Sequence, residues 1–255
     1  FTDTIMTTQP TVLVTGAAKR VGKMLAIAFA RHGWHIGLHY NSSGAEVDQA
    51  VEEIEAAGGT ATRLQANLRD AEAVGDLIER AEALPNWQAL VNSAAIFERD
   101  RTPSITEQRW HDHQAINLEA PMRLSQAFAA QAEPDANNLI LNILDSKMAR
   151  PNEHYISYSV SKAGLWYLTQ AQALDLAPNI RVNAIGPGPT LVAPGQSETQ
   201  FEKAVKTLPL QRAPAAEEFE AAVDFLLTAR SVTGQMIALD GGGHLGWLPP
   251  ARGVS

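Results

Sequence analysis

Short β-rich runs alternate with longer amphipathic runs along this chain, and this alternation is the feature that most constrains its fold. Several of the β-rich runs lack polar alternation, which is typical of strands buried on both faces of a sheet. Such a pattern predicts a parallel sheet whose strands are joined by crossover helices. The predicted strands are Thr11–Thr15, Trp34–Tyr40, Thr60–Ala66, Ala89–Asn92, Asn138–Leu144, Ile180–Ile185 and Gln235–Leu239.

Several runs between these strands have the apolar spacing of helices that bury one face. The predicted helices are Val21–His32, Ala45–Ala57 and Asp70–Leu84, with Asp70 as the expected N-cap of the third. No internal repeat, low-complexity linker or change of composition divides the chain. We therefore expect one α/β domain over residues 11–248, between a leader (1–10) that is disordered or foreign to the domain and a tail (249–255).

Residues 190–212 interrupt the alternation with three Pro or Gly residues around one weak helical segment, Glu198–Thr207. The insertion falls at the carboxyl edge of the predicted sheet, where open α/β folds bind their ligands. We therefore expect a lid over a substrate, and a mere surface excursion is the alternative.

Composition excludes several classes of function. The chain has no cysteine, which excludes a disulfide framework, thiolate metal sites and a cysteine nucleophile. Its net charge of −8 makes nucleic acid and anionic membranes poor partners. No apolar run approaches the roughly 18–20 residues that a membrane helix needs, so we expect a cytoplasmic protein.

The segment Thr15–Gly22 predicts a phosphate-binding turn between the first strand and the first helix. A glycine-rich turn presents backbone N–H groups at a helix N-terminus, where a diphosphate is stabilised. Gly16 and Gly22 permit the tight turn and close packing, although they lie six residues apart and not in the usual G-x-G-x-x-G pattern. The expected cofactor contacts of this turn are Gly16, Lys19, Arg20, Val21 and Gly22.

The end of the second strand favours NADP(H) over NAD(H). A site for NAD normally places Asp or Glu there to bind the ribose 2′-hydroxyl. This chain has no such carboxylate, so nothing repels a 2′-phosphate, and we expect Arg20 and His39 to supply charge. The segment expected to bind this part of the cofactor is His39, Tyr40, Asn41, Ser42 and Ser43; a polar loop that caps a helix is compatible with this role.

Tyr158 and Lys162 are the candidate catalytic pair. They are four residues apart at the start of a helical run, Tyr158–Leu174, so they share one face. An ammonium beside a phenol favours the phenolate, and we expect Lys162 to lower the pKa of Tyr158. The nearby Tyr155 fails this test because Ser159 stands four residues after it.

In order and spacing, this chain resembles the short-chain dehydrogenase/reductase family along essentially its whole length. The motifs are Thr15–Gly22, Asn92-Ser93-Ala94-Ala95, Asn117, Tyr158-x-x-x-Lys162, Pro187-Gly188, Leu208-Pro209-Leu210 and Asp240-Gly241-Gly242. The resemblance implies a Rossmann-type, doubly wound, seven-stranded parallel sheet, a nicotinamide cofactor and a homotetramer. It also implies a proton relay through Asn117, Lys162 and Tyr158. The further cofactor contacts that it implies are Asn67, Leu68, Asn92, Ala94, Lys162, Pro187 and Gly188.

Asp145 departs from most of that family, which places a serine 13 residues before the tyrosine. Ser146 is one position late and would face the other side of the strand. Ketone reduction develops negative charge on oxygen, which a carboxylate repels. A C=N substrate instead gains a proton on nitrogen, which a carboxyl group can relay. Asp145 therefore favours a nitrogen heterocycle.

Within the family, the chain resembles pteridine reductases and the bacterial dihydromonapterin/dihydrofolate reductases of the same type. That resemblance implies that Arg20 lies close to both diphosphate and pterin, and that Phe97 stacks on the pterin ring. The expected substrate contacts are Arg20, Phe97, Asp145, Tyr158, Pro189 and Leu191. Asn67, where an aspartate is usual, and Ala95, where a polar residue is common in parasite enzymes, are departures.

Other aromatic and imidazole side chains are assigned to packing or to solvent. His111 and His113 face apart on a helix, so we expect solvated residues and no metal site. Trp110, Trp166 and Tyr167 fit core or subunit contacts, and Trp247 is a weak candidate for substrate or subunit contact.

The sequence therefore predicts an NADPH-dependent reductase that takes a dihydropteridine to its tetrahydro form. Phe97 and the nicotinamide would clamp the ring, and dihydrofolate is a further candidate substrate. A carbonyl or 3-oxoacyl reductase of the same family is the first alternative. A non-catalytic NADP(H)-binding regulatory protein is the second, against which the Tyr158/Lys162 pair argues.

Overall fold

The computed structural model describes residues 9–42, 44–134, 136–146, 153–193 and 195–246. The predicted positions Ser43 and Trp247 lie outside these residues, as do residues 1–8 of the leader and the tail. The strands are β1 (Thr11–Val14), β2 (His35–Tyr40), β3 (Thr60–Gln65), β4 (Trp87–Asn92), β5 (Asn138–Ile143), β6 (Ile180–Pro187) and β7 (Met236–Leu239).

All seven strands form one parallel sheet in the order β3-β2-β1-β4-β5-β6-β7. The order reverses between β1 and β4, which makes the sheet doubly wound, and open α/β sheets bind their ligands outside the carboxyl ends of the strands at such a point. The predicted Rossmann-type fold is confirmed. β1 and β5 are buried along their whole length, as expected for strands covered on both faces.

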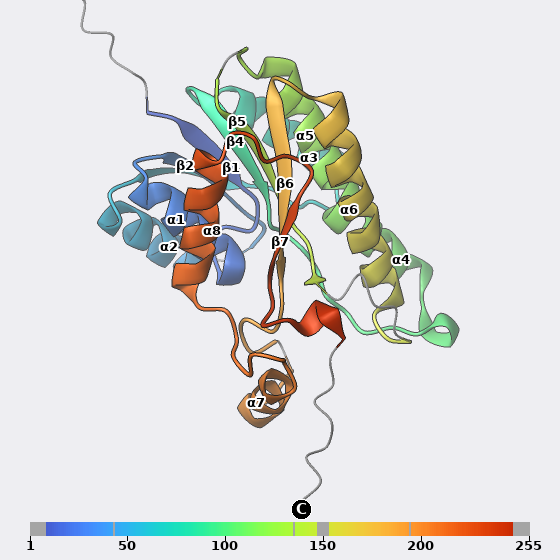
Figure 1. The fold of residues 1–255 in the computed structure, drawn as a ribbon. Coiled ribbons are helices and arrows are strands. Elements are labelled where there is room, and N and C mark those ends of the chain that lie inside the picture. Colours follow the sequence, from blue (N-terminus) through green and yellow to red (C-terminus); the bar gives the residue numbers. More distant parts are fainter. Residues whose placement is uncertain (1–8, 43, 135, 147–152, 194, 247–255) are drawn as a thin grey trace, which may run out of the picture.

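Helices cover both faces of the sheet (Figure 1). One face carries α1 (Arg20–Arg31), α2 (Gly44–Ala56) and α8 (Ala216–Thr228). The other carries α3 (Ala71–Glu82), α4 (Glu107–Gln114), α5 (Ala120–Gln131) and α6 (Ile156–Asp175). The short α7 (Glu198–Lys206) lies beyond the end of the sheet where β6 finishes (Figure 1). Short 3₁₀ turns occupy Thr102–Ser104 and Gly243–Leu245.

Local sequence explains where several helices begin. Asp70 accepts a hydrogen bond from the backbone N–H of Glu72 over 2.9 Å, so the predicted cap of α3 is confirmed. Ser197 and Gln200 form a capping box at the start of α7. Helix α6 begins two residues before the predicted start at Tyr158, directly after Tyr155 in a left-handed conformation (φ +58°).

Candidate active site

The phosphate turn is packed so tightly that its glycines have no room for a side chain. A Cβ on Gly22 would lie 2.2 Å from the carbonyl oxygen of Gly16, and one on Gly16 would lie 3.0 Å from Cα of Ala94. The Thr15 hydroxyl accepts hydrogen bonds from the N–H groups of Ser93 (2.9 Å) and Ala94 (3.0 Å). The turn is thereby fastened to the end of β4, and it is a backbone cradle of the kind that fits a diphosphate.

The His39 ring, which is buried in β2, is hydrogen-bonded to the phosphate turn. Its Nδ1 accepts a hydrogen bond from the Gly16 N–H over 3.1 Å, and its Nε2 donates to the Ala66 carbonyl, also over 3.1 Å. Burial lowers the pKa of His39 to about 4, so the ring is neutral at pH 7. The expectation that His39 supplies charge to a 2′-phosphate is therefore wrong, because the side chain lies inside the fold and positions the turn.

The edge next to β2 has the chemistry expected for NADP(H). The described residues that directly follow β2 are Asn41, Ser42 and Gly44, which carry no carboxylate. Asn41 and Ser42 are exposed, and Tyr40 is half-buried. Lys19, also exposed, lies 3.8 Å from Glu46 at the start of α2, so an ammonium group stands at this edge.

Beyond β3, Asn67 is exposed and Leu68 is buried in the core. The Asn67 side chain accepts a hydrogen bond from the Arg69 N–H over 3.2 Å, which shapes the loop at the position expected for an adenine contact.

Tyr158 and Asp145 lie together at the carboxyl end of β5. The Tyr158 hydroxyl donates to Oδ2 of Asp145 over 3.1 Å. Lys162 is buried one turn further along α6, and its Nζ donates to the Ile143 carbonyl over 2.6 Å. These three of the four side chains predicted for catalysis are therefore close neighbours, with Asp145 as the group that touches the phenol.

The electrostatics of the pair differ from the expectation. Burial raises the pKa of Tyr158 well above its usual value, and the charge and hydrogen bond of Asp145 raise it further. Burial lowers the pKa of Lys162 to about 8, against the opposing effect of Asp145. Lys162 was expected to lower the pKa of Tyr158; instead burial and the adjacent Asp145 raise that pKa, so the phenol stays protonated at neutral pH.

Ser146 and Asp145 contact different groups, and because both lie beyond the end of β5 at Ile143, strand alternation does not account for their directions. Ser146 is buried, and its hydroxyl is hydrogen-bonded to Asp240. The Asp240 carboxylate also accepts from the N–H groups of Gly242 (2.9 Å) and His244 (2.7 Å) and from the His244 ring (2.9 Å). This network holds Ser146 at Asp240, and Asp145 is left to meet the Tyr158 hydroxyl.

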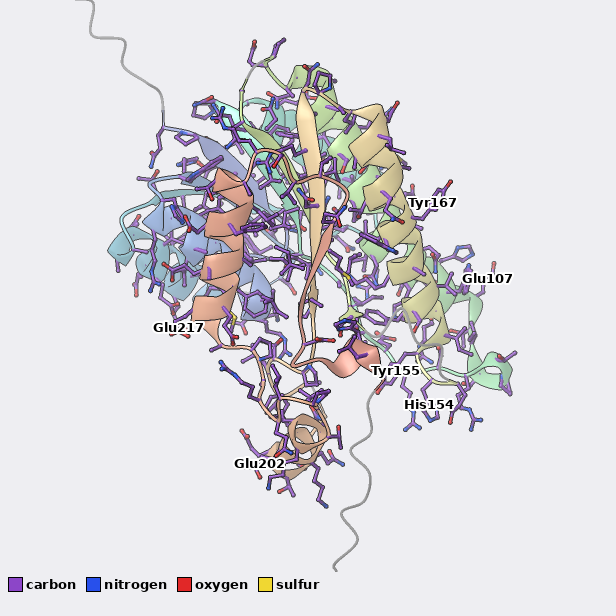
Figure 2. All side chains as sticks on the ribbon, in the orientation of Figure 1. Glu107, His154, Tyr155, Tyr167, Glu202 and Glu217 are labelled. Carbon is purple, nitrogen blue, oxygen red and sulfur yellow. The ribbon has the colours of Figure 1, made fainter. Side chains whose placement is uncertain are left out.

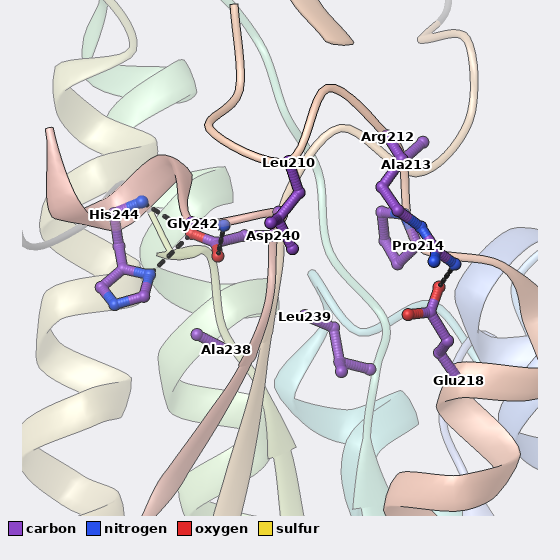
Figure 3. A pocket seen from close by; sticks show the side chains of 11 residues that line it. Leu210, Arg212, Ala213, Pro214, Glu218, Ala238, Leu239, Asp240, Gly242 and His244 are labelled. Carbon is purple, nitrogen blue, oxygen red and sulfur yellow. Dashed lines mark hydrogen bonds and ion pairs between the residues drawn. The ribbon is translucent and has the colours of Figure 1, made fainter. Parts of the chain in front are cut away.

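Figure 3 shows Asp240 and His244 at one side of a pocket of about 200 Å³. The opposite side is formed by Arg212 and Glu218, which are ion-paired over 3.1 Å. Sequence reasoning missed Asp240 as an anchor, although the Asp240-Gly241-Gly242 motif was the available signal.

Asn117 lies in a π-helical turn, Ala115–Glu119, between α4 and α5. Its amide accepts from the N–H of Ile96 (3.0 Å) and donates to the carbonyl of Ile96 (3.1 Å) and to Ser161 (3.0 Å). The side chain is fully buried, and its partner Ser161 lies between Tyr158 and Lys162 on α6. π-Turns inside helices are frequent at functional sites.

Asn92, expected to lie near the cofactor, is also buried, and its amide donates to Asn142 over 2.8 Å. Its side chain holds β4 to β5, so it shapes the site from within the sheet instead of facing it.

Phe97 forms an exposed aromatic wall beside Tyr158. Its side chain is 49% exposed, its ring stacks on Tyr155 with centroids 4.3 Å apart, and it meets Tyr158 edge-on at 4.7 Å. Figure 2 shows Tyr155 and His154 together near the start of α6. Tyr155 was set aside as a catalytic candidate, and sequence reasoning gave no signal that it would back Phe97.

Arg20 connects the phosphate turn to the loop after β6. Its guanidinium donates to the carbonyls of Val192 (2.8 Å) and Leu191 (3.3 Å). Gly188 packs against the backbone of Asp240, and its N–H donates to Leu239 over 2.9 Å. The predicted contacts Pro187, Gly188, Pro189 and Leu191 therefore line one loop, which Arg20 reaches from across the carboxyl edge of the sheet.

His113 was expected to be solvated, and that expectation is wrong. Its side chain is fully buried, because the helix turns it beneath Tyr158 with ring centroids 6.2 Å apart. His111 is exposed as predicted. The part of the chain that the structure describes contains no cluster of metal-ligating side chains.

Trp110 and Trp166 are half-buried, whereas Tyr167 is 75% exposed on the outer side of α6 (Figure 2). This placement fits the packing or subunit contacts expected for these aromatic residues.

Comparison with known proteins decides the family. A family model described as enoyl-(acyl carrier protein) reductase matches residues 16–244. The chain belongs to the short-chain dehydrogenase/reductase family. It is 30% identical to the 3-oxoacyl-[acyl-carrier-protein] reductase FabG of Staphylococcus aureus, over 91% of this chain and 97% of that protein. It is 32% identical to a 3-oxoacyl-[acyl-carrier-protein] reductase of Synechocystis, over 92% and 97%.

Solved structures include nearer relatives by sequence. FolM alternative dihydrofolate reductase 1 from Brucella canis, complexed with NADP, has a TM-score of 0.88 and 39% identity over 95% of this chain and 97% of that one. The Brucella suis protein, also with NADP, has the same score and identity. The predicted family and enzyme class are confirmed: the chain is an oxidoreductase of this family. No helix among the described residues is long and apolar enough to cross a membrane.

Proposed function

We propose that this protein is an NADPH-dependent reductase that converts a dihydropteridine-type substrate to its tetrahydro form. The single observation that carries the proposal is the 3.1 Å hydrogen bond between Tyr158 and Asp145, with Ser146 bonded to Asp240 and away from the phenol. A carboxylate thus stands where a ketone reductase needs a hydrogen-bond donor.

Support for NADPH comes from the phosphate turn and from the edge beyond β2. Gly16 and Gly22 make a cradle that any added Cβ would fill. The exposed Asn41, Ser42 and Lys19 offer donors and positive charge, and Asn41 and Ser42 replace the carboxylate that would repel a 2′-phosphate. The two Brucella FolM proteins, with 39% identity to this chain, were crystallised with NADP.

The side chains divide the chemistry as follows. NADPH, when bound, supplies the hydride for a ring carbon of a C=N unit. Tyr158, kept protonated by burial and by Asp145, donates its proton toward the ring nitrogen as that nitrogen becomes an amine. Asp145 accepts hydrogen bonds from the N–H groups of the heterocycle and passes a proton from water back to the phenol. Phe97 packs on one face of the flat ring.

A 3-oxoacyl reductase is the second candidate, because the curated relatives at 30–32% identity carry that activity. Its substrate is a ketone, whose oxygen becomes an alkoxide beside the catalytic tyrosine. Asp145 would repel that charge, which is the reason to favour the pteridine.

Asp145→Ser separates the two candidates. In a pteridine reductase, this variant should lose roughly 10²–10⁴-fold in kcat with dihydrobiopterin, the range for losing a positioned proton-transfer group. In a ketone reductase it should preserve or improve turnover of an acetoacetyl thioester. NADPH oxidation is measured with dihydrobiopterin, dihydromonapterin, dihydrofolate and the thioester, and NADPH affinity is the control. Wild-type turnover of the thioester alone would refute the pteridine assignment, and tight NADPH binding without turnover would indicate a regulatory protein.

We also propose a cytoplasmic homotetramer, as family resemblance suggests. Tyr167 on the outer side of α6 is an exposed aromatic residue suited to a subunit contact. Light scattering of the purified protein tests the subunit number.

A further inference from the structure

The segment that carries Phe97 is held at every second residue by a buried polar side chain. Ile96 is bound by Asn117 through both its N–H and its carbonyl. Glu98 is bound by His113 of α4, and Asp100 is bound by Ser157 of α6. Since Phe97 lies between two held neighbours, its backbone has little freedom to move.

His113 holds Glu98. The Glu98 N–H donates to Nε2 of His113 over 3.3 Å, so Nδ1 of the neutral ring carries the proton. Nδ1 lies 2.9 Å from the Arg109 carbonyl and 3.0 Å from the Ser157 hydroxyl oxygen. One protonation state therefore satisfies every contact of this fully buried ring.

Asp100 completes the chain of hydrogen bonds. Its buried carboxylate accepts from the Ser157 hydroxyl and from the Ser157 N–H (3.3 Å), and its carbonyl accepts from the Tyr155 N–H (3.0 Å). The bonds run in one direction, from the Glu98 amide through His113 and Ser157 to Asp100. They join the Phe97 segment to the first turn of α6, which carries Tyr158.

The same contacts position the second aromatic ring. Tyr155 adopts φ +58°, a left-handed conformation that costs a bulky residue energy and that its surroundings must enforce. Its N–H is bound by Asp100, and its ring stacks on Phe97 at an interplanar angle of 8°. The wall formed by Phe97 and Tyr155 is therefore set at a fixed angle to Tyr158, 79° for Phe97.

We infer that Asp100, His113 and Ser157 are positioning residues that hold the Phe97/Tyr155 wall for stacking on a flat heterocyclic substrate. The inference rests on the proposed function and extends it to side chains that do not touch the substrate. A wall that is already ordered loses less entropy when a ring binds, so the network lowers KM for the heterocycle. It leaves the phosphate turn, on the far side of β4, untouched.

Three variants and one matched control test this inference. Ser157→Ala removes the central hydroxyl, His113→Leu removes the acceptor for Glu98, and His113→Gln restores an acceptor of similar reach. Ser125→Ala is the control, because Ser125 on α5 is also buried and its hydroxyl has no hydrogen-bond partner among the residues that the structure describes. The readouts are kcat and KM for dihydrobiopterin, Kd for NADPH, and amide exchange of the peptide over residues 96–100.

We expect Ser157→Ala and His113→Leu to raise KM for dihydrobiopterin about tenfold, with a smaller change in kcat and none in Kd for NADPH. Amide exchange over 96–100 should accelerate in both variants, and His113→Gln should recover most of the loss. Ser125→Ala should behave as wild type.

The inference is overturned if amide exchange accelerates while KM stays at the wild-type value, or if both stay unchanged. It is also overturned if kcat and NADPH affinity fall while KM rises in all variants, because that pattern indicates general unfolding. A wild-type protein that ignores dihydropterins would instead refute the proposed function, which is a separate outcome.

Discussion

The hydroxyl of Tyr158 donates to Oδ2 of Asp145 over 3.1 Å, so the carboxylate meets the phenol directly. Lys162, four residues further along α6, donates to the Ile143 carbonyl. The carboxylate favours protonation of both neighbours, since it raises the pKa of Tyr158 and opposes the fall in the pKa of Lys162. The pair therefore stores a proton at Tyr158 throughout the neutral pH range.

Asp145→Asn should lower the pKa of both Tyr158 and Lys162, because the charge that raises them is removed. The pKa of Lys162 is about 8 with the Asp145 carboxylate present, and it should be lower than that in Asp145→Asn. Activity that depends on a charged Lys162 is lost as pH rises through this value, so the basic limb of the kcat profile should move to lower pH.

Tyrosinate absorbance, taken as the difference between Asp145→Asn and Asp145→Asn/Tyr158→Phe, reports the phenol directly. A basic limb at the same pH in wild type and Asp145→Asn would contradict this account of the pair.

The fold was predictable because its main signals are local in sequence. The fully apolar run at Leu13 can only be a strand covered on both faces, and the Asp70 cap is a local hydrogen bond. The π-turn around Asn117 and the left-handed Tyr155 were not predictable. Both conformations are enforced by tertiary contacts with the segment 96–100, which no local pattern encodes.

The candidate site was predicted in part for the same reason. The two-residue period of a strand predicts that Asp145 and Ser146 face apart. They do contact different groups, but both lie beyond the end of β5 at Ile143, so the local turn and not the strand sets their directions. His39 and His113 were misjudged because their burial depends on neighbours far away in sequence. The role of Asp240 was not predicted, because its hydrogen bond with Ser146 joins two residues that are far apart in sequence.

His39 should make the fold sensitive to acid. Its pKa is about 4 in the folded chain and about 6.5 when unfolded, so its contribution is fully present above pH 6.5. That contribution is lost as pH falls toward 4, because His39 binds a proton in the unfolded chain at a higher pH than it does in the folded chain. The resulting loss in free energy of unfolding approaches about 3 kcal/mol.

Denaturant unfolding at pH 7 and pH 5 should show a smaller acid penalty for His39→Gln than for wild type. Equal penalties would show that His39 does not titrate on unfolding. His111→Gln is the control, because that imidazole is exposed in the native state.

Gly22→Ala should damage the phosphate turn, whereas Gly44→Ala should not. The new Cβ at position 22 would lie 2.2 Å from the Gly16 carbonyl oxygen, which is backbone and cannot rotate aside. Relieving this overlap costs about 1–3 kcal/mol and displaces the backbone expected to meet the diphosphate.

At Gly44, at the start of α2, an added Cβ would have no atom of the described residues within 4 Å beyond its chain neighbours and its own helix backbone. We expect NADPH affinity to fall at least about tenfold in Gly22→Ala, corresponding to about 1.4 kcal/mol, with Gly44→Ala at the wild-type value. Fluorescence titration with NADPH and thermal melts of both variants measure the effect. Equal NADPH affinity in the two variants would contradict the close packing of the turn.

Arg20 should fasten the loop after β6 to the phosphate turn. Its two hydrogen bonds reach the carbonyls of Leu191 and Val192, and they are contacts between the turn and the segment that leads into α7. Arg20→Gln shortens the side chain and removes the guanidinium, so the loop should open more often. Trypsin should then cleave at Lys203 and Lys206 roughly three to ten times faster, as expected for losing one or two partly exposed hydrogen bonds.

Lys19→Gln is the matched control for Arg20→Gln, because Lys19 is the adjacent exposed cation and its ion pair is with Glu46, away from the loop. A loop held by Arg20 predicts faster cleavage in Arg20→Gln alone, whereas a general effect of charge at the turn predicts similar changes in both variants. Identical cleavage rates in Arg20→Gln and wild type would mean that the two hydrogen bonds do not restrain the loop. Arg20 is the first residue of α1, and its guanidinium binds the loop carbonyls of Leu191 and Val192. We therefore expect the phosphate turn and this loop to become ordered or mobile together.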